Sequence, residues 1–401
     1  MSSFESSAFL RRLKSNTENA SNKPKVPGQI RISRETSDDL KGPGDTDIGK
    51  SAGKESSSPP QSGGSDIVSA QKGTYVSSYR LSQFEKILDM ENVDLDSLRK
   101  IAWNGIPPKY RPDVWQMLLG YLPTNKDRRI TAINRKRKEY NDSINTYFAV
   151  DELDRTKQDE DNLGQILIDL VRTSPNIAFF QQPLVQKAME RILYIWSIRH
   201  PASGYVQGMN DLLTPLLLVS LQPFTEDPLR CDVATLDPVV LANVEADAYW
   251  CLSKLLDNIQ DHYTFGQPGL QRMNLRLEDL VQRLDQQLHA HLQEQGVMVQ
   301  HFSTRWMNCA LIRELPLRSI MRLWDTYFAE EHGGFENFHV YVCVVMLKTF
   351  KDVIIKMEFQ DILLFMQNLP TSDWGEEEVE PILSQAFILS TLFDNSPSHL
   401  N

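Results

Sequence analysis

The sequence contains few cysteines, and these lie far apart along its 401 residues. No two of them form the CxxC pair that is typical of zinc sites and redox motifs. We therefore expect reduced thiols in the core of an intracellular protein, and neither a disulfide framework nor a metal site. The four residues are Cys231, Cys251, Cys309 and Cys343.

Long hydrophobic runs and an excess of positive charge are also missing. The longest apolar stretch, residues 338–347, spans about ten residues, whereas a helix that crosses a bilayer needs about twenty. The first residues lack the basic-then-apolar pattern of a secretory signal. The net charge of −11 argues against non-specific nucleic-acid binding, which depends on clustered Lys and Arg. We expect a soluble, cytoplasmic protein that does not bind nucleic acid and associates with membranes only peripherally.

A supported motif of an independent hydrolase is missing as well. The sequence has no H-E-x-x-H. Residues 44–51 match the phosphate-loop pattern G-x-x-x-x-G-K-[ST], but that motif needs a buried strand before it and a helix after it. The flanking residues here are charged on one side and rich in Ser and Pro on the other, so we expect no nucleotide site. An NTPase working through this segment is the weaker alternative, and it requires that the isolated chain binds nucleotide.

Residues 1–78 are rich in Ser, Gly, Pro, Lys and Asp and contain few large apolar side chains. Such a segment cannot bury enough surface to offset its ordering entropy, so we expect a disordered tail. Arg31-x-Ser33 and Arg34-x-x-Ser37 are candidate kinase sites, through which the tail would bind an adaptor after phosphorylation.

From about Ser82 onward, apolar residues recur at spacings of three and four, which predicts helices. No alternating strands joined by Asn-Gly or Asp-Gly appear. We expect an all-α body in two packed lobes, because one bundle core rarely organises about 300 residues. A leading helical segment is predicted over residues 79–104. The strongest later runs cover residues 183–198, 244–259, 277–292, 317–324 and 379–393.

Two short polar signatures lie in the middle of this helical region. One is Ile166-x-x-Asp169-x-x-Arg172 and the other is Tyr205-x-Gln207. Each offers one long polar side chain, an arginine and a glutamine. These are the two groups needed to hydrolyse a nucleotide held by another protein, because arginine neutralises a phosphoryl transition state and a glutamine amide orients the attacking water.

Four stretches in order resemble the TBC domain family of Rab GTPase-activating proteins, and in detail the member 22 branch, which is associated with the Golgi. Residues 105–115 resemble the opening helix of that domain, residues 165–173 its arginine-finger motif, residues 203–211 its glutamine-finger motif, and residues 322–328 a motif late in its second lobe. The resemblance predicts a TBC domain over residues 105–331, with residues 332–401 completing it as C-terminal helices and a short tail. Val171 departs from the family, whose members often place proline before the arginine.

The resemblance implies that the chain accelerates GTP hydrolysis on a Rab-family GTPase, with Arg172 and Gln207 entering the partner's nucleotide site. It implies no cofactor of the chain's own, since GTP and Mg²⁺ are bound by the partner. It also implies a peripheral location at the Golgi. The alternative is a Rab-binding effector or trafficking scaffold that keeps the TBC fold without catalysis.

Other residues of the motifs are expected to support the two fingers. Asp169 either shares a helical face with Arg172 and holds its guanidinium, or forms a plain surface ion pair with it. Tyr205 is expected to aim the glutamine loop, while Gly204 and Gly208 let that backbone approach the partner.

The remaining motif residues are expected to be architectural or to support the glutamine loop. Ile166 belongs to the arginine-finger motif. Arg111 is expected to pair near the catalytic groove, and Trp115 to lie in the core. Asn210 and Asp211 either support the glutamine loop or cap the following helix, with capping preferred.

Overall fold

The computed structural model describes residues 78–149, 155–331 and 333–393. The chain divides into Met1–Gln71 and Lys72–Asn401, and every described residue belongs to the second unit. Apart from Ser78, the predicted tail therefore lies outside the described residues. The candidate phosphorylation sites and the phosphate-loop match lie outside them too.

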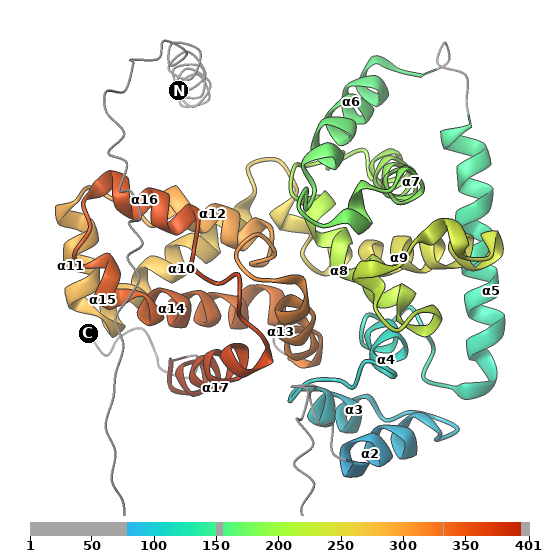
Figure 1. The fold of residues 1–401 in the computed structure, drawn as a ribbon, viewed down its shortest axis with the longest axis horizontal. Helices are drawn as coiled ribbons and strands as arrows, with labels where there is room; N and C mark the ends of the chain where they lie inside the picture. The colour runs from blue at the N-terminus through green and yellow to red at the C-terminus, as the bar shows by residue number, and fades with distance from the viewer. Residues whose placement is uncertain (1–77, 150–154, 332, 394–401) are drawn as a thin grey trace, which may run out of the picture. The chain divides into compact units, whose positions relative to one another are not determined.

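The described residues form helices and no strands, with one isolated bridge between Asn92 and Asn125 (Figure 1). We call the first group of helices the first lobe and the second group the second lobe. The first lobe contains α2 (Ser78–Leu88), α3 (Leu95–Ala102), α4 (Arg111–Leu118), α5 (Lys126–Ser143), α6 (Lys157–Arg172), α7 (Pro183–Arg199), α8 (Met209–Leu221) and α9 (Pro238–Asn258). The second lobe contains α10 (Pro268–Leu284), α11 (Gln286–Glu294), α12 (Gln300–Asn308), α13 (Leu317–Ala329), α14 (His339–Thr349), α15 (Lys351–Ile354), α16 (Phe359–Gln367) and α17 (Glu376–Phe393). The predicted all-α fold in two lobes is confirmed.

Short helical segments join several of these elements. Two of them are π-helical and the rest are 3-10 turns. They are η1 (Ile144–Phe148), η3 (Ala178–Gln181), η4 (Gln222–Phe224), η5 (Pro228–Arg230), η6 (Val233–Thr235), η7 (Gln260–His262) and η8 (Gly334–Phe338).

Each lobe is built around one mainly apolar helix that is buried on every side. All residues of α8 are buried, and α8 packs against α9, α7 and α4. In the second lobe α14 is buried from His339 to Leu347 and packs against α17, α10 and α12. A helix with apolar residues on all its faces requires cover on all sides, which explains why other helices surround these two.

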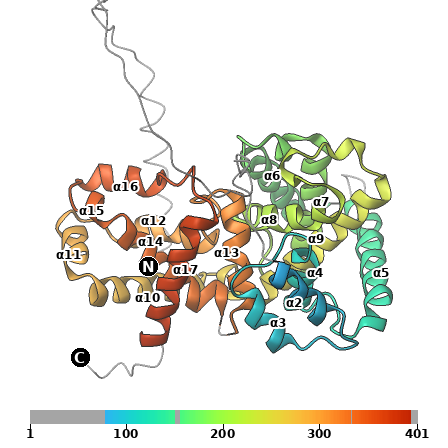
Figure 2. The same ribbon diagram turned by 60° about the horizontal axis from the view of Figure 1, so that its bottom comes forward.

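Helix α13 joins the lobes. It contacts α3, α4 and α8 of the first lobe and α17 of the second, and it lies between the two groups in both ribbon views (Figures 1 and 2). Its buried apolar residues belong to the same hydrophobic cluster as those of α8 and α14. The lobes therefore share one continuous core.

One predicted helix is divided in the structure. The apolar run 277–292 forms α10 and α11, because the chain leaves helical geometry at Asp285 (φ −149°, ψ 78°). The Asp285 carboxylate accepts a hydrogen bond from the Leu288 amide and so starts a new helix. The prediction missed this break because the spacing of four from Leu284 to Leu288 continues across it.

Within the described ranges, no helix is both long enough and apolar enough to cross a membrane.

Candidate functional site

Arg172 is the last residue of α6. A capping box formed by Thr156 and Asp159 fixes the start of this helix. Ile166 and Asp169 face inward and are 0% and 2% exposed, whereas Arg172 is exposed. The Arg172 side chain has no hydrogen bond or ion pair within the described part of the chain. Its position at the C-terminus of a helix is electrostatically favourable for a cation, but its guanidinium remains available.

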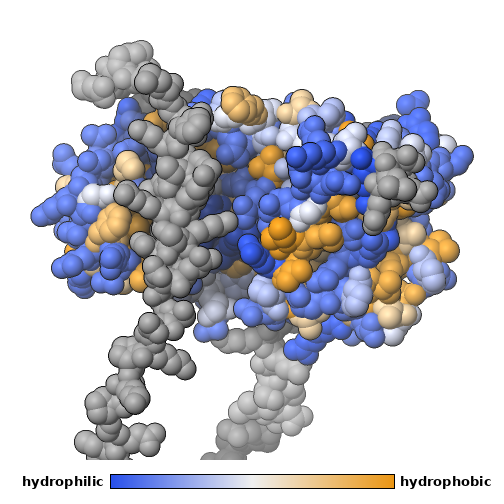
Figure 3. Space-filling view, turned by 90° about the horizontal axis from the view of Figure 1, so that it is seen from above, coloured by the Kyte–Doolittle hydropathy of each residue, from blue (hydrophilic) through white to orange (hydrophobic). Residues whose placement is uncertain are grey.

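The outward face of α6 beside Arg172 is apolar. Leu167, Ile168 and Val171 are exposed by 45%, 50% and 66%. In the space-filling view, hydrophobic residues gather on the half of the surface that contains α6 and α7 (Figure 3). Arg172 therefore extends from a surface that is partly hydrophobic.

Gln207 lies in a loop, residues 204–208, that leads into α8. We call this segment the glutamine loop. The Gln207 side chain is exposed and, among the described residues, has no hydrogen-bond partner. Tyr205 is 9% exposed and points into the protein, so the two motif side chains take opposite directions.

Both glycines of the glutamine loop adopt positive φ, which L side chains rarely adopt (Gly204 φ 61°, Gly208 φ 106°). A Cβ on Gly204 would meet nothing closer than Asn162 at 3.6 Å. A Cβ on Gly208 would lie 2.3 Å from Nδ2 of Asn308, which leaves no room for it. We predicted that Gly208 permits close approach to a partner protein; the close neighbour found is this chain's own second lobe.

A buried set of hydrogen bonds joins the end of α6 to the glutamine loop. We call its members, Asp169, Thr173, Tyr205 and Asn210, the finger network. The Tyr205 hydroxyl lies 3.0 Å from Oδ2 of Asp169 and 3.2 Å from Oδ1 of Asn210. Asn210 Nδ2 donates to Thr173 Oγ1 at 2.9 Å. The network thereby holds the backbones that carry Arg172 and Gln207 side by side.

Burial, and then the nearby Asp169 carboxylate, raise the pKa of the Tyr205 hydroxyl well above its usual range. Tyr205 therefore remains a hydrogen-bond donor at every physiological pH. This supports the prediction that it aims the glutamine loop, with the hydroxyl as the responsible group.

The proposed pairing of Asp169 with Arg172 is wrong. Asp169 accepts a hydrogen bond from Tyr205, and within the described chain it forms no ion pair with Arg172. The reason is the position of each residue on α6: Asp169 lies on the buried face of its last turn, while Arg172 lies on the exposed face.

The preferred capping role for Asn210 and Asp211 is also wrong. The N-cap of α8 is Gly208, and no side chain caps it. Oδ1 of Asn210 instead accepts the Gly208 amide at 3.1 Å, so Asn210 supports the glutamine loop. Asp211 forms a 2.8 Å ion pair with Arg313 of the second lobe. Burial raises the pKa of the Asp211 carboxyl, and Arg313 acts against this rise.

Arg111 and Trp115 have the architectural role that we expected. Nε of Arg111 donates to Asp325 Oδ1, its Nη2 donates to Oδ2, each at 2.9 Å, and Trp115 Nε1 donates to Oδ1 at 2.7 Å. The Ile106 amide adds a fourth bond at 2.8 Å. We call Arg111, Trp115 and Asp325 the Asp325 cluster. It is buried and joins α4 to α13, so Arg111 is not available to a partner protein.

Sequence reasoning missed several residues that hold the site together. Thr173 is the C-cap of α6 and belongs to the finger network. Asn308 and Arg313, more than a hundred positions further along the chain, bond to Gln207 and Asp211. Nothing in the sequence near Asn308 indicates this contact, because it depends on how the second lobe packs on the first.

One group of side chains has metal-ligand chemistry. Ligand atoms of Asp261, His262 and Glu336 all lie within 4.8 Å of one another. Arg272 already pairs with both carboxylates and supplies the positive charge that a metal would bring. We therefore regard this group as an ion-pair cluster of the second lobe.

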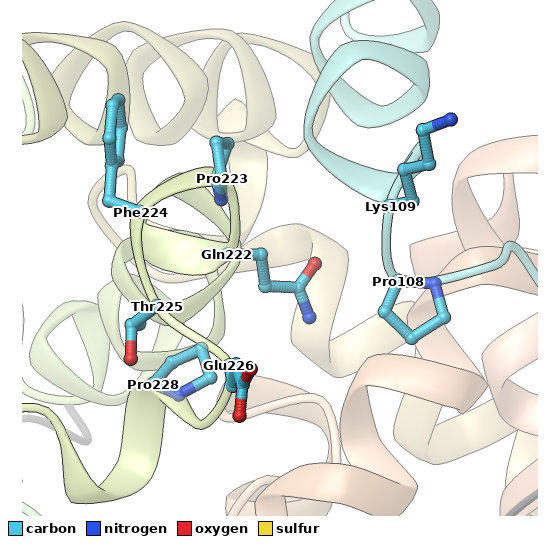
Figure 4. Close-up of a pocket in the computed structure, with 8 residues that line it drawn as sticks. All are labelled: Pro108, Lys109, Gln222, Pro223, Phe224, Thr225, Glu226 and Pro228. Atoms are coloured by element: carbon cyan, nitrogen blue, oxygen red, sulfur yellow. The ribbon is translucent and has the colours of Figure 1, made fainter.

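A hollow of about 690 Å³ lies between the segment before α4 and the turns after α8 (Figure 4). Pro108 and Lys109 line one side, and residues 222–226 with Pro228 line the other. It contains none of the predicted site residues. Gln222 and Gln207 flank opposite ends of α8, so the hollow is separate from the candidate fingers.

The sequence of this chain matches the model of a known protein family. The family model for the Rab-GTPase-TBC domain matches residues 108–355. The chain therefore belongs to the Rab-GTPase-TBC domain family, as the sequence motifs predicted.

Individual relatives agree with this assignment. The chain is 47% identical to the GTPase-activating protein gyp1 of Schizosaccharomyces pombe over 337 residues, which cover 84% of this chain and 65% of that protein. It is 48% identical to TBC1 domain family member 22B of Homo sapiens over 322 residues, 80% of this chain and 63% of the relative. The chain thus spans just under two thirds of the length of both.

Solved structures show the same fold. The crystal structure of the Ypt/Rab-GAP domain of Gyp1p superposes with a TM-score of 0.74 at 42% identity, covering 79% of this chain and 98% of that domain. The Chlamydomonas flagellar RabGAP TBC domain is 22% identical, covers 77% of this chain and 90% of that one, and has a TM-score of 0.55, which shows a shared fold.

Proposed function

We propose that this chain is a GTPase-activating protein for a Rab-family small GTPase, and that Arg172 and Gln207 complete the partner's hydrolytic site. The observation that carries the proposal is the finger network. Two long polar side chains are exposed and unbonded within the described residues, while the backbones beneath them are joined through buried hydrogen bonds.

The chemistry divides between the two side chains. The Arg172 guanidinium would pair with phosphoryl oxygens as charge develops in the transition state, and its planar fork suits two oxygens at once. The Gln207 carboxamide would orient the attacking water. GTP and Mg²⁺ would arrive with the GTPase, so this chain needs neither. An arginine supplied in trans contributes about 10³ to 10⁵ in rate, which is about 4 to 7 kcal/mol of activation free energy.

The relatives support the partner class. Gyp1 is a GTPase-activating protein by its name, and the matching crystal structure is a Ypt/Rab-GAP domain. The family-model match covers both motif segments, residues 165–173 and 203–211. A polar pair of this kind on a Rab-GTPase-TBC fold supports catalysis in preference to a passive binding surface.

The experiment is single-turnover GTP hydrolysis across a panel of Rab GTPases, with wild type, Arg172→Ala and Gln207→Ala. We expect acceleration of at least one Rab, a loss of about 10³-fold or more in Arg172→Ala, and a smaller loss in Gln207→Ala. Undiminished rates in Arg172→Ala on every responsive Rab would exclude the mechanism. Tight binding of a GTP-loaded Rab without acceleration would instead indicate an effector or scaffold.

We also propose that the segment before α2 determines location and not catalysis. Phosphorylation near Ser33 or Ser37 would create an adaptor site that recruits the chain to the surface of Golgi membranes. Removing residues 1–77 should then change location in cells and leave the solution rate unchanged, whereas a lost rate would contradict this division.

A further inference from the structure

The glutamine loop is held by the second lobe as well as by the finger network. Nδ2 of Asn308, the last residue of α12, donates a hydrogen bond to the backbone carbonyl of Gln207 at 2.8 Å. This bond is made to the backbone of the residue whose side chain is exposed. It therefore fixes the position of Gln207 and leaves its carboxamide available.

Asn308 is itself fixed from several directions. The hydroxyl of Tyr263 donates to the Asn308 carbonyl at 2.9 Å. Ala310 and Leu311, which follow Cys309, are buried in left-handed conformation (φ 45° and 62°), which residues with a Cβ adopt only where packing imposes it. Asn308 is thus presented by a turn with little freedom to move.

The orientation of the Asn308 amide follows from its surroundings. Only the NH₂ group can donate to a carbonyl, so Nδ2 must face Gln207. Its Oδ1 is buried and has no hydrogen-bond partner among the described residues. An oxygen in place of Nδ2 would face the Gln207 carbonyl oxygen and repel it.

A second contact between the lobes lies just after the glutamine loop. Asp211, in the first turn of α8, pairs with Arg313 at 2.8 Å and accepts a weak hydrogen bond from the Cys309 thiol at 3.5 Å. Gly208, between Gln207 and Asp211, fits against Asn308 only because it lacks a side chain. The segment from Asn308 to Arg313 therefore follows the glutamine loop closely.

We infer that Asn308 is a positioning residue for Gln207: both fingers belong to the first lobe, and the second lobe helps to fix the position of the glutamine finger. The inference rests on the proposed function. The two residues are 101 positions apart, so their contact depends on how the second lobe packs on the first.

The test compares Asn308→Asp with Asn274→Asp in the full chain. Both substitutions replace a buried or half-buried amide of the second lobe with an isosteric carboxylate. Asn274 accepts from the Ser303 hydroxyl and donates to the Thr304 hydroxyl, which can rotate to donate to a carboxylate, and Asn274 does not contact the glutamine loop. We expect Asn308→Asp to lower kcat about ten-fold with KM unchanged, and Asn274→Asp to change neither.

A double-mutant cycle separates positioning from general damage. In the Gln207→Ala background, Asn308→Asp should have no further effect on rate, because the side chain that it positions is gone. A purely structural role would give the same loss in both backgrounds and would overturn the inference.

Hydrogen exchange tests the same contact without GTPase chemistry. The Gly208 and Met209 amides bond within their own loop region, to Asn210 Oδ1 and the Val206 carbonyl. In Asn308→Asp they should exchange about ten-fold faster than in Asn274→Asp. Equal exchange in the two variants overturns the inference. Failure of the proposed function would appear separately, as an Arg172→Ala variant with undiminished rate.

Discussion

Two buried carboxylates, Asp325 and Asp169, organise two parts of this molecule in different ways. Asp325 is 0% exposed and binds Arg111, an arginine of another motif, inside the protein. Asp169 is 2% exposed and binds Tyr205, while its motif arginine, Arg172, faces solvent. Arg111 and Asp325 pair although they lie 214 positions apart in two different motifs, whereas Asp169 and Arg172 lie three positions apart in one motif and do not pair. The difference teaches that burial, and not closeness in sequence, decides whether an arginine pairs internally or stays available to a partner.

The largest effect on stability is expected at the Asp325 cluster. Asp325→Ala leaves the buried Arg111 guanidinium without its counter-charge, which should lower the free energy of unfolding by about 3 to 5 kcal/mol. Chemical denaturation measures this loss. The control is Asp257→Ala, which removes a half-exposed pair with Lys254 and should cost at most about 1 kcal/mol. A loss at Asp325 no greater than the control's would remove the distinction between the two carboxylates.

A buried group of the second lobe extends the comparison to pH. Burial lowers the pKa of His339 to about 3. Its Nε2 faces the Trp306 carbonyl at 3.1 Å and the Cys343 thiol at 3.5 Å, and its Nδ1 accepts from the Tyr327 hydroxyl at 2.7 Å, so the ring is neutral. Below about pH 6.5 the unfolded chain binds a proton at this histidine and the folded chain does not. The free energy of unfolding therefore decreases as the pH is lowered.

Between pH 7 and pH 5 this single group should lower the free energy of unfolding by about 2 kcal/mol. The measurement is the difference between wild type and His339→Gln at each pH, because other titrating groups are common to both proteins. The stability advantage of wild type should shrink by that amount at pH 5. A difference that does not vary with pH would mean that folding leaves the pKa of His339 unchanged.

The finger network should respond less than the Asp325 cluster. Tyr205→Phe removes a neutral donor from Asp169 and Asn210, and we expect a loss of about 1 to 2 kcal/mol in the free energy of unfolding. Tyr79→Phe, at a side chain exposed by 68%, is the control and should change little. If Tyr205→Phe cost as much as Asp325→Ala, the two parts of the molecule would be equally important to the fold.

The fold could be predicted from the sequence because helices leave a periodic pattern. The spacing of three and four across 183–198 predicted α7, and α17 follows the run at 379–393. The break at Asp285 could not be predicted, since an aspartate that starts a helix and an aspartate on a helix surface look the same in sequence.

The site was predictable only in part. Motif spacing identified Arg172 and Gln207 as candidates, and the structure shows both side chains exposed. Which side chain Asp169 binds depends on which face of α6 is buried. Asn308 contacts Gln207 only because the two lobes pack against each other. Such long-range contacts leave no local pattern in a single sequence.

The smallest expected effect on stability belongs to the residue with the largest expected effect on rate. Arg172 is exposed and has no partner in the described structure, so Arg172→Ala should change the free energy of unfolding by no more than about 0.5 kcal/mol. The same variant should lose about 10³-fold in Rab-stimulated hydrolysis. Arg111→Ala should instead lower the free energy of unfolding strongly, because its guanidinium is buried against Asp325. If Arg172→Ala instead destabilised the protein by several kcal/mol, its lost activity would have a structural cause, and the contrast between an internal arginine and a presented one would disappear.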